Sequence, residues 1–128
     1  MRVAIIGSRT PQTEEEKEKT YALICHNVPA SATELVSGGA DGVDRLVQRF
    51  ADEKGIPLAV FKPDYLKYGK LAPLKRNDKI IAYAQYVIAL WDGFSHGTAY
   101  TVTACVRDGV PVKVIPLETR NGPSFFQI

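Results

Sequence analysis

The sequence predicts an α/β fold: a Rossmann-like three-layer sandwich in which a five-stranded parallel sheet, of strand order 3-2-1-4-5, carries helices on both faces. Short apolar runs alternate with segments of helical periodicity along the 128 residues, and strands separated by helices imply right-handed crossovers and a parallel sheet. Two glycine-rich loops, Ser37–Gly42 and Asp92–Thr98, each follow an apolar run and precede a helical segment. Both loops are therefore expected at the carboxyl edge of the sheet, where such folds bind ligands.

The chain begins with a strand and an amphipathic helix. Arg2–Gly7 is an apolar run that ends in a Gly-Ser turn, which predicts the first strand. Thr13 is a suitable N-cap for a helix that runs to about Asn27, and the three glutamates after it favour the helix dipole. Tyr21 and Ile24 are spaced to face the sheet, which leaves the charged residues of this helix in solvent.

A second strand and helix follow, and then a third strand. Leu35–Val36 belongs to a buried strand before the first glycine-rich loop. Between Gly42 and Lys54 the apolar residues fall on one helical face, and Gly55 ends this helix in the usual manner. The run Pro57–Lys62 is expected to be the third strand.

The second half repeats the alternation twice more. Lys70–Ala84 has helical character, with a regular part expected to begin near Pro73 because proline is tolerated in a first turn. The fourth and fifth strands are expected at Tyr86–Trp91 and Val110–Ile115. The helix between them, Gly97–Asp108, is expected to turn Val102, Cys105 and Val106 inward.

Length and composition indicate a single domain over residues 1–128, long enough to bury a core. A formal net charge of +2 neither requires nor excludes a polyanionic partner. Cys25 and Cys105 form no metal-binding or redox motif, and both are expected to be buried in helices. No apolar stretch approaches the ~20 residues of a membrane span, so we expect a cytoplasmic protein without a membrane partner.

The second glycine-rich loop and the first strand end offer groups for an anion. Gly97 and Thr98 open the last helix, where free backbone N–H groups and the threonine hydroxyl can hold a phosphate; an ordinary first-turn role for Thr98 is the alternative. Arg9 follows the first strand, so its guanidinium can reach the same edge or remain on the surface. Asp92 can bind a ribose or a water, although turn formation also explains an Asp-Gly pair.

The first glycine-rich loop offers carboxylates. Gly38 and Gly39 allow close approach of the backbone to a ligand. Asp41 and Asp44 can accept hydrogen bonds from ribose hydroxyls, and N-capping of the next helix is the competing role, chiefly for Asp41.

Further candidates lie between the third and fourth strands. Arg76 and Asn77 can bind a phosphate or carboxylate; the alternative is that they lie on a helix face exposed to solvent. Tyr65, Tyr68 and Lys70 belong to a loop that can stack on a base and contact phosphate, or pack on the domain or a second subunit. His96 is expected in solvent, and no spacing of Cys, His and carboxylates indicates a metal site.

The order of these motifs resembles the SLOG superfamily of Rossmann-like proteins, which includes the LOG phosphoribohydrolases and the DNA-processing protein DprA. The likeness is greatest to its small, single-domain YspA-like members. It is carried by Gly7-Ser8-Arg9, Ser37-Gly38-Gly39-Ala40-Asp41-Gly42-Val43-Asp44, Pro63-Asp64-Tyr65, Tyr68-Gly69-Lys70, Arg76-Asn77, and Trp91-Asp92-Gly93 with Ser95, Gly97 and Thr98. The resemblance implies a nucleotide-derived ligand across the carboxyl edge of the sheet and favours a homodimer or larger assembly, to which Phe125-Phe126 of the tail could contribute.

One departure from the LOG pattern bears on catalysis. LOG enzymes carry a catalytic glutamate three residues after the Gly-Thr pair, and this chain has Thr101 there. Threonine cannot replace a carboxylate as a base or stabilise an oxocarbenium-like sugar by charge. The catalytic residues are unknown, with Arg76, Asp92 and Asp44 as candidates.

We therefore expect a nucleotide-binding or sensing protein that requires no cofactor, with a bound nucleotide possible. The first alternative is an N-glycosidase acting on nucleoside monophosphates, and the second is DprA-like binding of single-stranded DNA, which the weak net charge disfavours. The residues and the resemblance together predict one ligand-binding set: Gly7, Ser8, Arg9, Ser37, Gly38, Gly39, Asp41, Asp44, Tyr68, Lys70, Arg76, Asn77, Asp92, Gly93, Ser95, Gly97 and Thr98.

Overall fold

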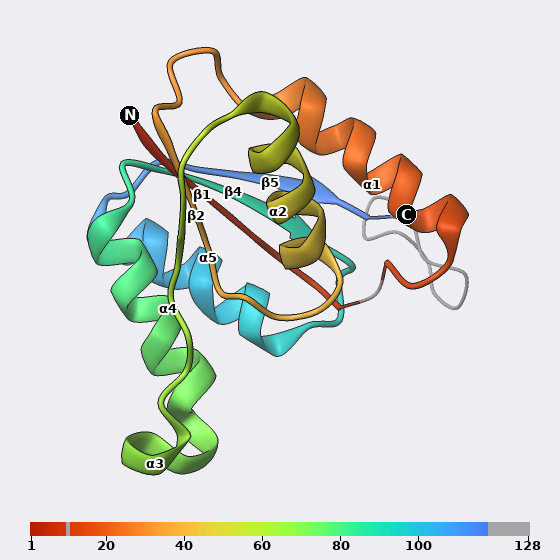
Figure 1. Ribbon diagram of the computed structural model, residues 1–128. Coiled ribbons are helices and arrows are strands. Elements are labelled where there is room, and N and C mark those ends of the chain that lie inside the picture. Colours follow the sequence, from red (N-terminus) through yellow and green to blue (C-terminus); the bar gives the residue numbers. More distant parts are fainter. Residues whose placement is uncertain (10, 118–128) are drawn as a thin grey trace.

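The computed structural model describes residues 1–9 and 11–117 and shows a three-layer α/β domain (Figure 1). Its five strands pair in parallel in the order β3-β2-β1-β4-β5, which confirms the predicted sheet. The strands are β1 (Arg2–Gly7), β2 (Glu34–Ser37), β3 (Leu58–Val60), β4 (Tyr86–Trp91) and β5 (Val112–Pro116). The helices are α1 (Glu14–Asn27), α2 (Val43–Lys54), α3 (Tyr65–Tyr68), the 3-10 helix η1 (Gly69–Leu71), α4 (Ala72–Tyr83) and α5 (His96–Asp108).

Local signals explain where the first two long helices begin and end. The Thr13 hydroxyl accepts a hydrogen bond from the Glu16 N–H at 3.1 Å, and the Glu16 carboxylate accepts from the Thr13 N–H at 3.1 Å, which completes a capping box for α1. Helix α2 ends at Gly55, which has a positive φ of 66° and so closes the helix in the left-handed conformation that glycine adopts readily.

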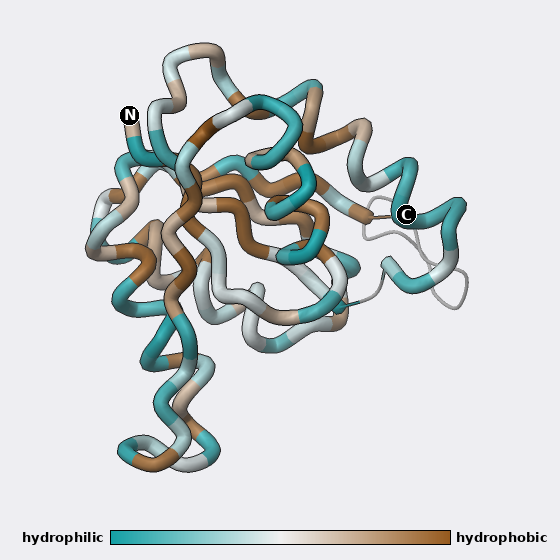
Figure 2. Tube along the Cα trace, in the orientation of Figure 1, coloured by the Kyte–Doolittle hydropathy of each residue, from teal (hydrophilic) through white to brown (hydrophobic). Residues whose placement is uncertain are grey.

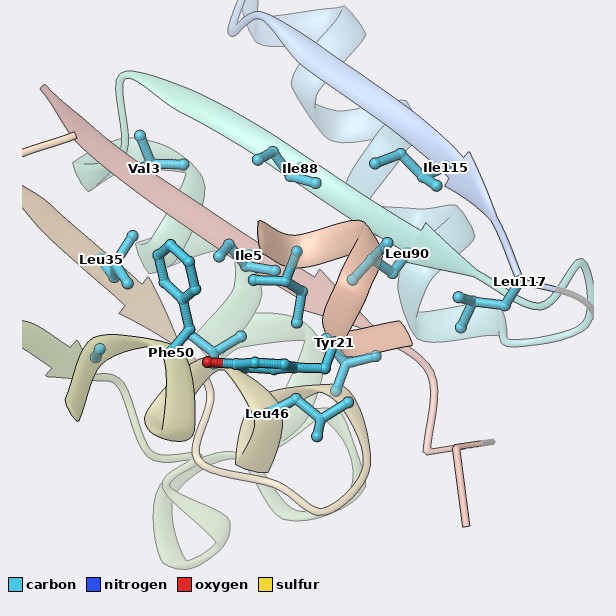
Figure 3. Close-up of a cluster of buried hydrophobic side chains, with 14 residues drawn as sticks. Val3, Ile5, Tyr21, Leu35, Leu46, Phe50, Ile88, Leu90, Ile115 and Leu117 are labelled. Carbon is cyan, nitrogen blue, oxygen red and sulfur yellow. The ribbon is translucent and has the colours of Figure 1, made fainter. Parts of the chain in front are cut away.

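The sheet separates two apolar cores. On one face, α1 and α2 cover a cluster that includes Ile5, Tyr21, Leu35, Phe50 and Leu90, and Figure 3 shows these side chains converging between the helices and the strands. On the other face, α4 and α5 cover a smaller cluster of aliphatic side chains. Because both faces are covered, the free carboxyl edge of the sheet is the natural place for a site.

The structure differs from the sequence-based expectations at two residues of the long helices. Cys25 is exposed and only Cys105 is buried, so the expectation that both cysteines are buried was wrong. Val106 is 71 % exposed, and the inward face of α5 is formed instead by Thr98, Thr101, Ala104 and Cys105. Thr98 and Thr101 can be buried on this face because their hydroxyls donate hydrogen bonds, to the Ser95 hydroxyl and to the Gly97 carbonyl.

The connection between β3 and β4 was expected to be a loop followed by one helix. It contains two short helical turns, α3 and η1, before α4 begins at Ala72, one residue before Pro73. Residues 62–75 form an arm that projects from the domain, with α3 at its tip (Figure 1). Neither α3 nor η1 has a buried residue, whereas Ala72 at the start of α4 is fully buried.

The tail that includes Phe125 and Phe126 lies outside the described residues. Within residues 1–9 and 11–117, no helix combines the length and apolar character that crossing a bilayer requires.

Candidate functional site

A pocket of about 410 Å³ opens at the carboxyl edge of the sheet, where β1, β2 and β4 end. Its wall combines strand ends, the α4 helix and the first turn of α5. The lining residues are Ile6, Gly7, Arg9, Gln12, Gly38, Ala40, Asp44, Pro73, Arg76, Asn77, Ile80, Asp92, Ser95, Gly97 and Thr98. Segments far apart in the sequence therefore meet in one concave, partly polar space, which is the usual form of a small-molecule site.

Arg76 is the most firmly positioned cation of this pocket. Its Nη1 donates to the Gly38 carbonyl at 2.6 Å, and its Nε donates to the Asn77 side-chain oxygen at 2.7 Å. The guanidinium lies so close to Gly38 that a Cβ at this position would stand 2.7 Å from its Cζ. A side chain at position 38 would therefore displace the Arg76 guanidinium from this position.

A chain of hydrogen bonds connects Arg76 to helix α5. The Asn77 amide donates to the Thr101 hydroxyl at 2.8 Å, and that hydroxyl donates to the Gly97 carbonyl at 2.9 Å. Thr101 is 0 % exposed and does not line the pocket. The position that carries glutamate in the LOG pattern is thus a buried structural position here, and it holds the arginine through Asn77.

Asp44 brings a carboxylate to the same pocket from the first turn of α2. Its Oδ2 accepts a hydrogen bond from the Ala40 N–H at 2.9 Å. Burial raises the pKa of Asp44 above its ordinary value, although this hydrogen bond and the charges of Arg76 and Arg9 oppose the rise. Burial likewise lowers the pKa of Arg76, partly compensated by Asp44, and an arginine remains protonated at neutral pH.

Asp41 does not cap α2, and it does not line the pocket. Gly42, and not Asp41, is the N-cap of α2, and no side chain caps that end. The Asp41 carboxylate instead pairs with Arg45 at 2.7 Å on the surface, with side-chain exposures of 74 % and 79 %. Asp44 is therefore the carboxylate that this loop gives to the pocket.

Asp92 organises the second glycine-rich loop. Its Oδ1 accepts hydrogen bonds from the backbone N–H groups of Phe94 at 2.8 Å and Ser95 at 2.9 Å. Its own N–H donates to the Ser8 hydroxyl at 3.2 Å, which ties the ends of β1 and β4 together. Asp92 lines the pocket, yet these bonds show the turn-forming role that was its alternative.

The first turn of α5 supplies the small polar groups of the pocket. Ser95 is the N-cap, but its side chain makes no capping hydrogen bond to the backbone. Its hydroxyl accepts from the buried Thr98 hydroxyl at 3.3 Å. A Cβ on Gly97 would meet nothing within 4 Å, so the space beside this turn is open. Free N–H groups at a helix start can bind an anion here.

The pocket contains ten of the seventeen predicted ligand-binding residues. The other seven lie elsewhere: Ser8, Ser37, Gly39, Asp41, Tyr68, Lys70 and Gly93. Ser8 is buried in the contact between loops, and Tyr68 lies on the arm, its ring beside the Lys67 and Lys79 ammonium groups at 5.2 and 6.0 Å. A role for Tyr68 and Lys70 at the pocket of their own chain is not supported by its lining.

Five lining residues were not predicted: Ile6, Gln12, Ala40, Pro73 and Ile80. Gln12 and Pro73 are single residues beside helix starts, and no motif marks them. Ala40 was part of a noted motif, but its contribution is a backbone N–H, which the residue type does not reveal.

These features define a class: a parallel α/β domain with an arginine-containing pocket at its carboxyl edge and a helix start facing that edge. Within this class the chain belongs to the YspA, cpYpsA-related SLOG family, whose model matches residues 1–68. The match covers Arg9 and the Ser37–Asp44 segment, whereas Arg76 and the Gly97-Thr98 pair lie beyond it.

Two solved structures share the fold. DNA processing protein A (DprA) from Streptococcus pneumoniae superposes with a TM-score of 0.73 at 19% sequence identity, covering 94% of this chain and 52% of that one. DprA from Helicobacter pylori, whose structure is described for its single-stranded DNA binding mode, gives a TM-score of 0.69 at 26% identity, with 94% and 67% covered. This chain thus spans about half the length of the first and two thirds of the second. No curated protein matches the sequence.

Proposed function

We propose that the protein binds a nucleotide-derived ligand in the carboxyl-edge pocket and acts as a binding or sensing protein. The observation that carries this proposal is the fixed guanidinium of Arg76 in a pocket that also contains the first turn of α5. A preorganised arginine and free helical N–H groups suit a phosphate. Membership of a SLOG family and a fold shared with DprA favour a nucleotide or nucleic-acid ligand.

The same pocket offers a partner for a sugar. Asp44 is partly buried, its Oδ2 accepts a hydrogen bond from the Ala40 N–H at 2.9 Å, and a carboxylate has about four lone-pair sites in all. A ribose hydroxyl can donate to this carboxylate while the phosphate lies on Arg76. The volume of about 410 Å³ is suited to a ligand of nucleotide size.

An N-glycosidase is the second candidate, because two carboxylates, Asp44 and Asp92, line the pocket. Thr101 does not supply the glutamate of the LOG pattern, and its hydroxyl is engaged with Asn77 and Gly97. Hydrolysis would therefore depend on one of the two aspartates as the acid or base. Binding of single-stranded DNA, for which the structure of the Helicobacter pylori relative is described, is the third candidate.

One experiment separates these functions. Purified protein is incubated with AMP, other nucleoside monophosphates, NAD, ADP-ribose and a single-stranded oligonucleotide, and mass spectrometry measures both retained compounds and released base. We expect an intact nucleotide to be retained by the wild type and by Arg45→Ala, and lost by Arg76→Ala. Arg45 is the matched control because it is exposed and does not line the pocket. It lies just after the Ser37–Gly42 loop, whose Gly38 carbonyl accepts a hydrogen bond from Arg76. Release of free base would identify a hydrolase instead, and retention of no compound would contradict the proposal.

A further inference from the structure

The tip of the arm, which consists of α3 and η1, presents apolar side chains to solvent. Leu66 is 102 % exposed, Tyr65 56 % and Leu71 55 %, and neither short helix has a buried residue. Figure 2 shows hydrophobic residues at the extreme end of the arm. Exposing leucines at the end of a projection is unfavourable in water, and a gathered apolar patch of this kind marks a contact with another molecule.

Local hydrogen bonds hold the tip in this exposed form. The Asp64 carboxylate accepts a hydrogen bond from the Lys67 N–H at 3.1 Å and so caps the start of α3. Gly69, with a positive φ of 55°, ends α3, and its N–H donates to the Tyr65 carbonyl. Leu66 therefore belongs to a closed helical turn that directs it away from the domain.

Lysines surround the apolar tip. The arm has four lysines against one aspartate, a net charge of +3, which leaves 12 basic and 13 acidic residues, a net charge of −1, on the rest of the chain. Lys62, Lys67, Lys70 and Lys75 are all exposed. Among residues 1–9 and 11–117, the salt bridges involve none of these lysines. The arm thus combines an apolar end with positive charge, which favours an anionic partner.

The positive charge continues from the arm to the carboxyl edge of the sheet. The base of the arm adjoins the pocket through Pro73, and the pocket wall includes Arg9 and Arg76. The same edge of a second copy would therefore meet the arm with like charge, which disfavours it as the partner. Helix α1, which has four glutamates against two lysines, lies on the opposite side of the domain from α3 (Figure 1). The charge distribution therefore turns the arm toward an anionic surface and α1 away from it.

The side chains of the tip match a lipid bilayer better than other anionic partners. Leucines can enter the acyl chains, tyrosine rings are suited to the headgroup level, and lysine stems reach lipid phosphates. A single-stranded nucleic acid would stack on the tyrosines but leave Leu66 and Leu71 in water. A stable protein interface uses roughly 20–30 residues on each side, whereas α3 and η1 have four and three. A bilayer needs neither a large footprint nor a complementary shape.

We propose that the arm docks this protein on an anionic lipid bilayer, with Leu66 inserted below the headgroups and Lys67 and Lys70 bound to lipid phosphates. The expectation of no membrane partner rested on the lack of a spanning segment, and a peripheral contact does not require one. Docking leaves the carboxyl-edge pocket with its own ligand, so this inference goes beyond the proposed nucleotide-binding function and does not depend on it.

The contact is tested by sedimentation of the full chain with vesicles. The wild type is expected to sediment with phosphatidylcholine vesicles that contain about one third phosphatidylglycerol, to remain in solution with pure phosphatidylcholine, and to dissociate as the salt concentration rises. Leu66→Glu should lower the partition coefficient at least about tenfold, because a leucine side chain leaves the apolar phase. Val106→Glu is the matched control and should have little effect, because Val106 is 71 % exposed on α5 and lies outside the arm.

The lysines are tested in the same assay. Lys67→Ala with Lys70→Ala should lower the partition coefficient about 25-fold, since each lysine at an anionic surface contributes about fivefold. Lys19→Ala with Lys54→Ala removes the same charge outside the arm and should have little effect. All four lysines are exposed, so both double variants should fold. Equal losses for the two double variants would show an effect of net charge alone and overturn the role of the arm.

The depth of the tip is measured with an environment-sensitive fluorophore on Leu66→Cys, in a Cys25→Ser background because Cys25 is exposed and Cys105 is buried. Anionic vesicles should shift the emission to the blue and protect the fluorophore from an aqueous quencher. The same fluorophore on Val106→Cys should show neither change. An unchanged spectrum at position 66 on vesicle-bound protein would overturn insertion of the leucine.

Three outcomes would overturn the proposal as a whole. They are absence of wild-type binding to anionic vesicles at low salt, equal effects of Leu66→Glu and Val106→Glu, and binding of a single-stranded oligonucleotide through the arm without binding of vesicles. The last result would identify the arm as a nucleic-acid surface. No nucleotide is present in the vesicle measurements, so failure of ADP-ribose to bind the pocket would contradict the proposed function and leave the membrane contact standing.

Discussion

Replacing Thr101 by valine tests whether this residue holds the pocket arginine in place. The substitution keeps the shape of the side chain and removes the hydroxyl that accepts from Asn77 at 2.8 Å and donates to the Gly97 carbonyl at 2.9 Å. Thr101 is 0 % exposed, so water does not readily replace the lost hydroxyl as the partner of the Asn77 amide. The change is therefore not neutral, although valine and threonine have nearly the same volume.

The structure sets the size of the effect. Two hydrogen bonds at about 1 kcal/mol each give a loss of about 2 kcal/mol in the free energy of unfolding. At an entropy of unfolding of about 2.1 cal/mol/K per residue, this corresponds to a decrease in Tm of roughly 7 °C for a chain of this length. The measurement is chemical and thermal unfolding of Thr101→Val beside Thr103→Val. Thr103 is the matched control, because it lies on the same helix and its hydroxyl donates to the Ala99 carbonyl at 2.9 Å, but it is exposed.

A second readout separates positioning from simple stability. The Nε–H of Arg76 donates to Asn77, so its NMR signal should be protected from exchange in the wild type and in Thr101→Ser, and exchange at least several-fold faster in Thr101→Val. Nucleotide affinity should follow the same order. Equal unfolding free energies for the two valine variants, or an unchanged Arg76 signal in Thr101→Val, would refute the reasoning.

Three further outcomes are expected. Gly97→Ala should preserve or slightly raise stability, by up to about 1 kcal/mol, because a Cβ there meets nothing within 4 Å, yet it should weaken nucleotide binding, measured by calorimetry, if a phosphate approaches this turn. Burial raises the pKa of Asp44, so ionising this carboxyl opposes folding as the pH rises above its ordinary value; urea unfolding should show Asp44→Asn gaining stability relative to the wild type between pH 3.5 and pH 7, and a constant difference would contradict this. A thiol reagent should label Cys25 in the native protein and Cys105 only after unfolding, and rapid labelling of both would refute the burial of Cys105.

The sheet was predictable because its signals are local. The runs Arg2–Gly7 and Tyr86–Trp91 are apolar apart from Arg2, and they became β1 and β4 with unchanged bounds. Thr13 similarly predicted the start of α1, and Gly55 predicted the end of α2, because a capping residue acts only on its own helix end. The alternation of strands and helices then leaves few topologies, and the order 3-2-1-4-5 was among them.

The arm and the buried threonine were not predictable for the opposite reason. Tyr65 and Leu66 have the composition of a packed segment, and only the fold shows that both are exposed, at 56 % and 102 %. From the sequence, Thr101 was noted only because it lacks the carboxylate that the LOG pattern has at this position. Its role depends on Asn77, 24 positions earlier, and becomes visible only when α4 packs on α5.

This role of Thr101 bears on the choice between binding and hydrolysis. A glutamate in its place would have to bury a charge where the threonine hydroxyl now joins Asn77 to the Gly97 carbonyl, and burying an unpaired carboxylate is costly. The interior of this domain is thus arranged for a neutral side chain at that position, and restoring the acid by Thr101→Glu should disturb Arg76 before it creates catalysis. Arg76 is fixed from the side of Asn77 and from Gly38 at once. A cation held in advance by hydrogen bonds to neutral groups is suited to an anion, which supports the proposed binding function over hydrolysis.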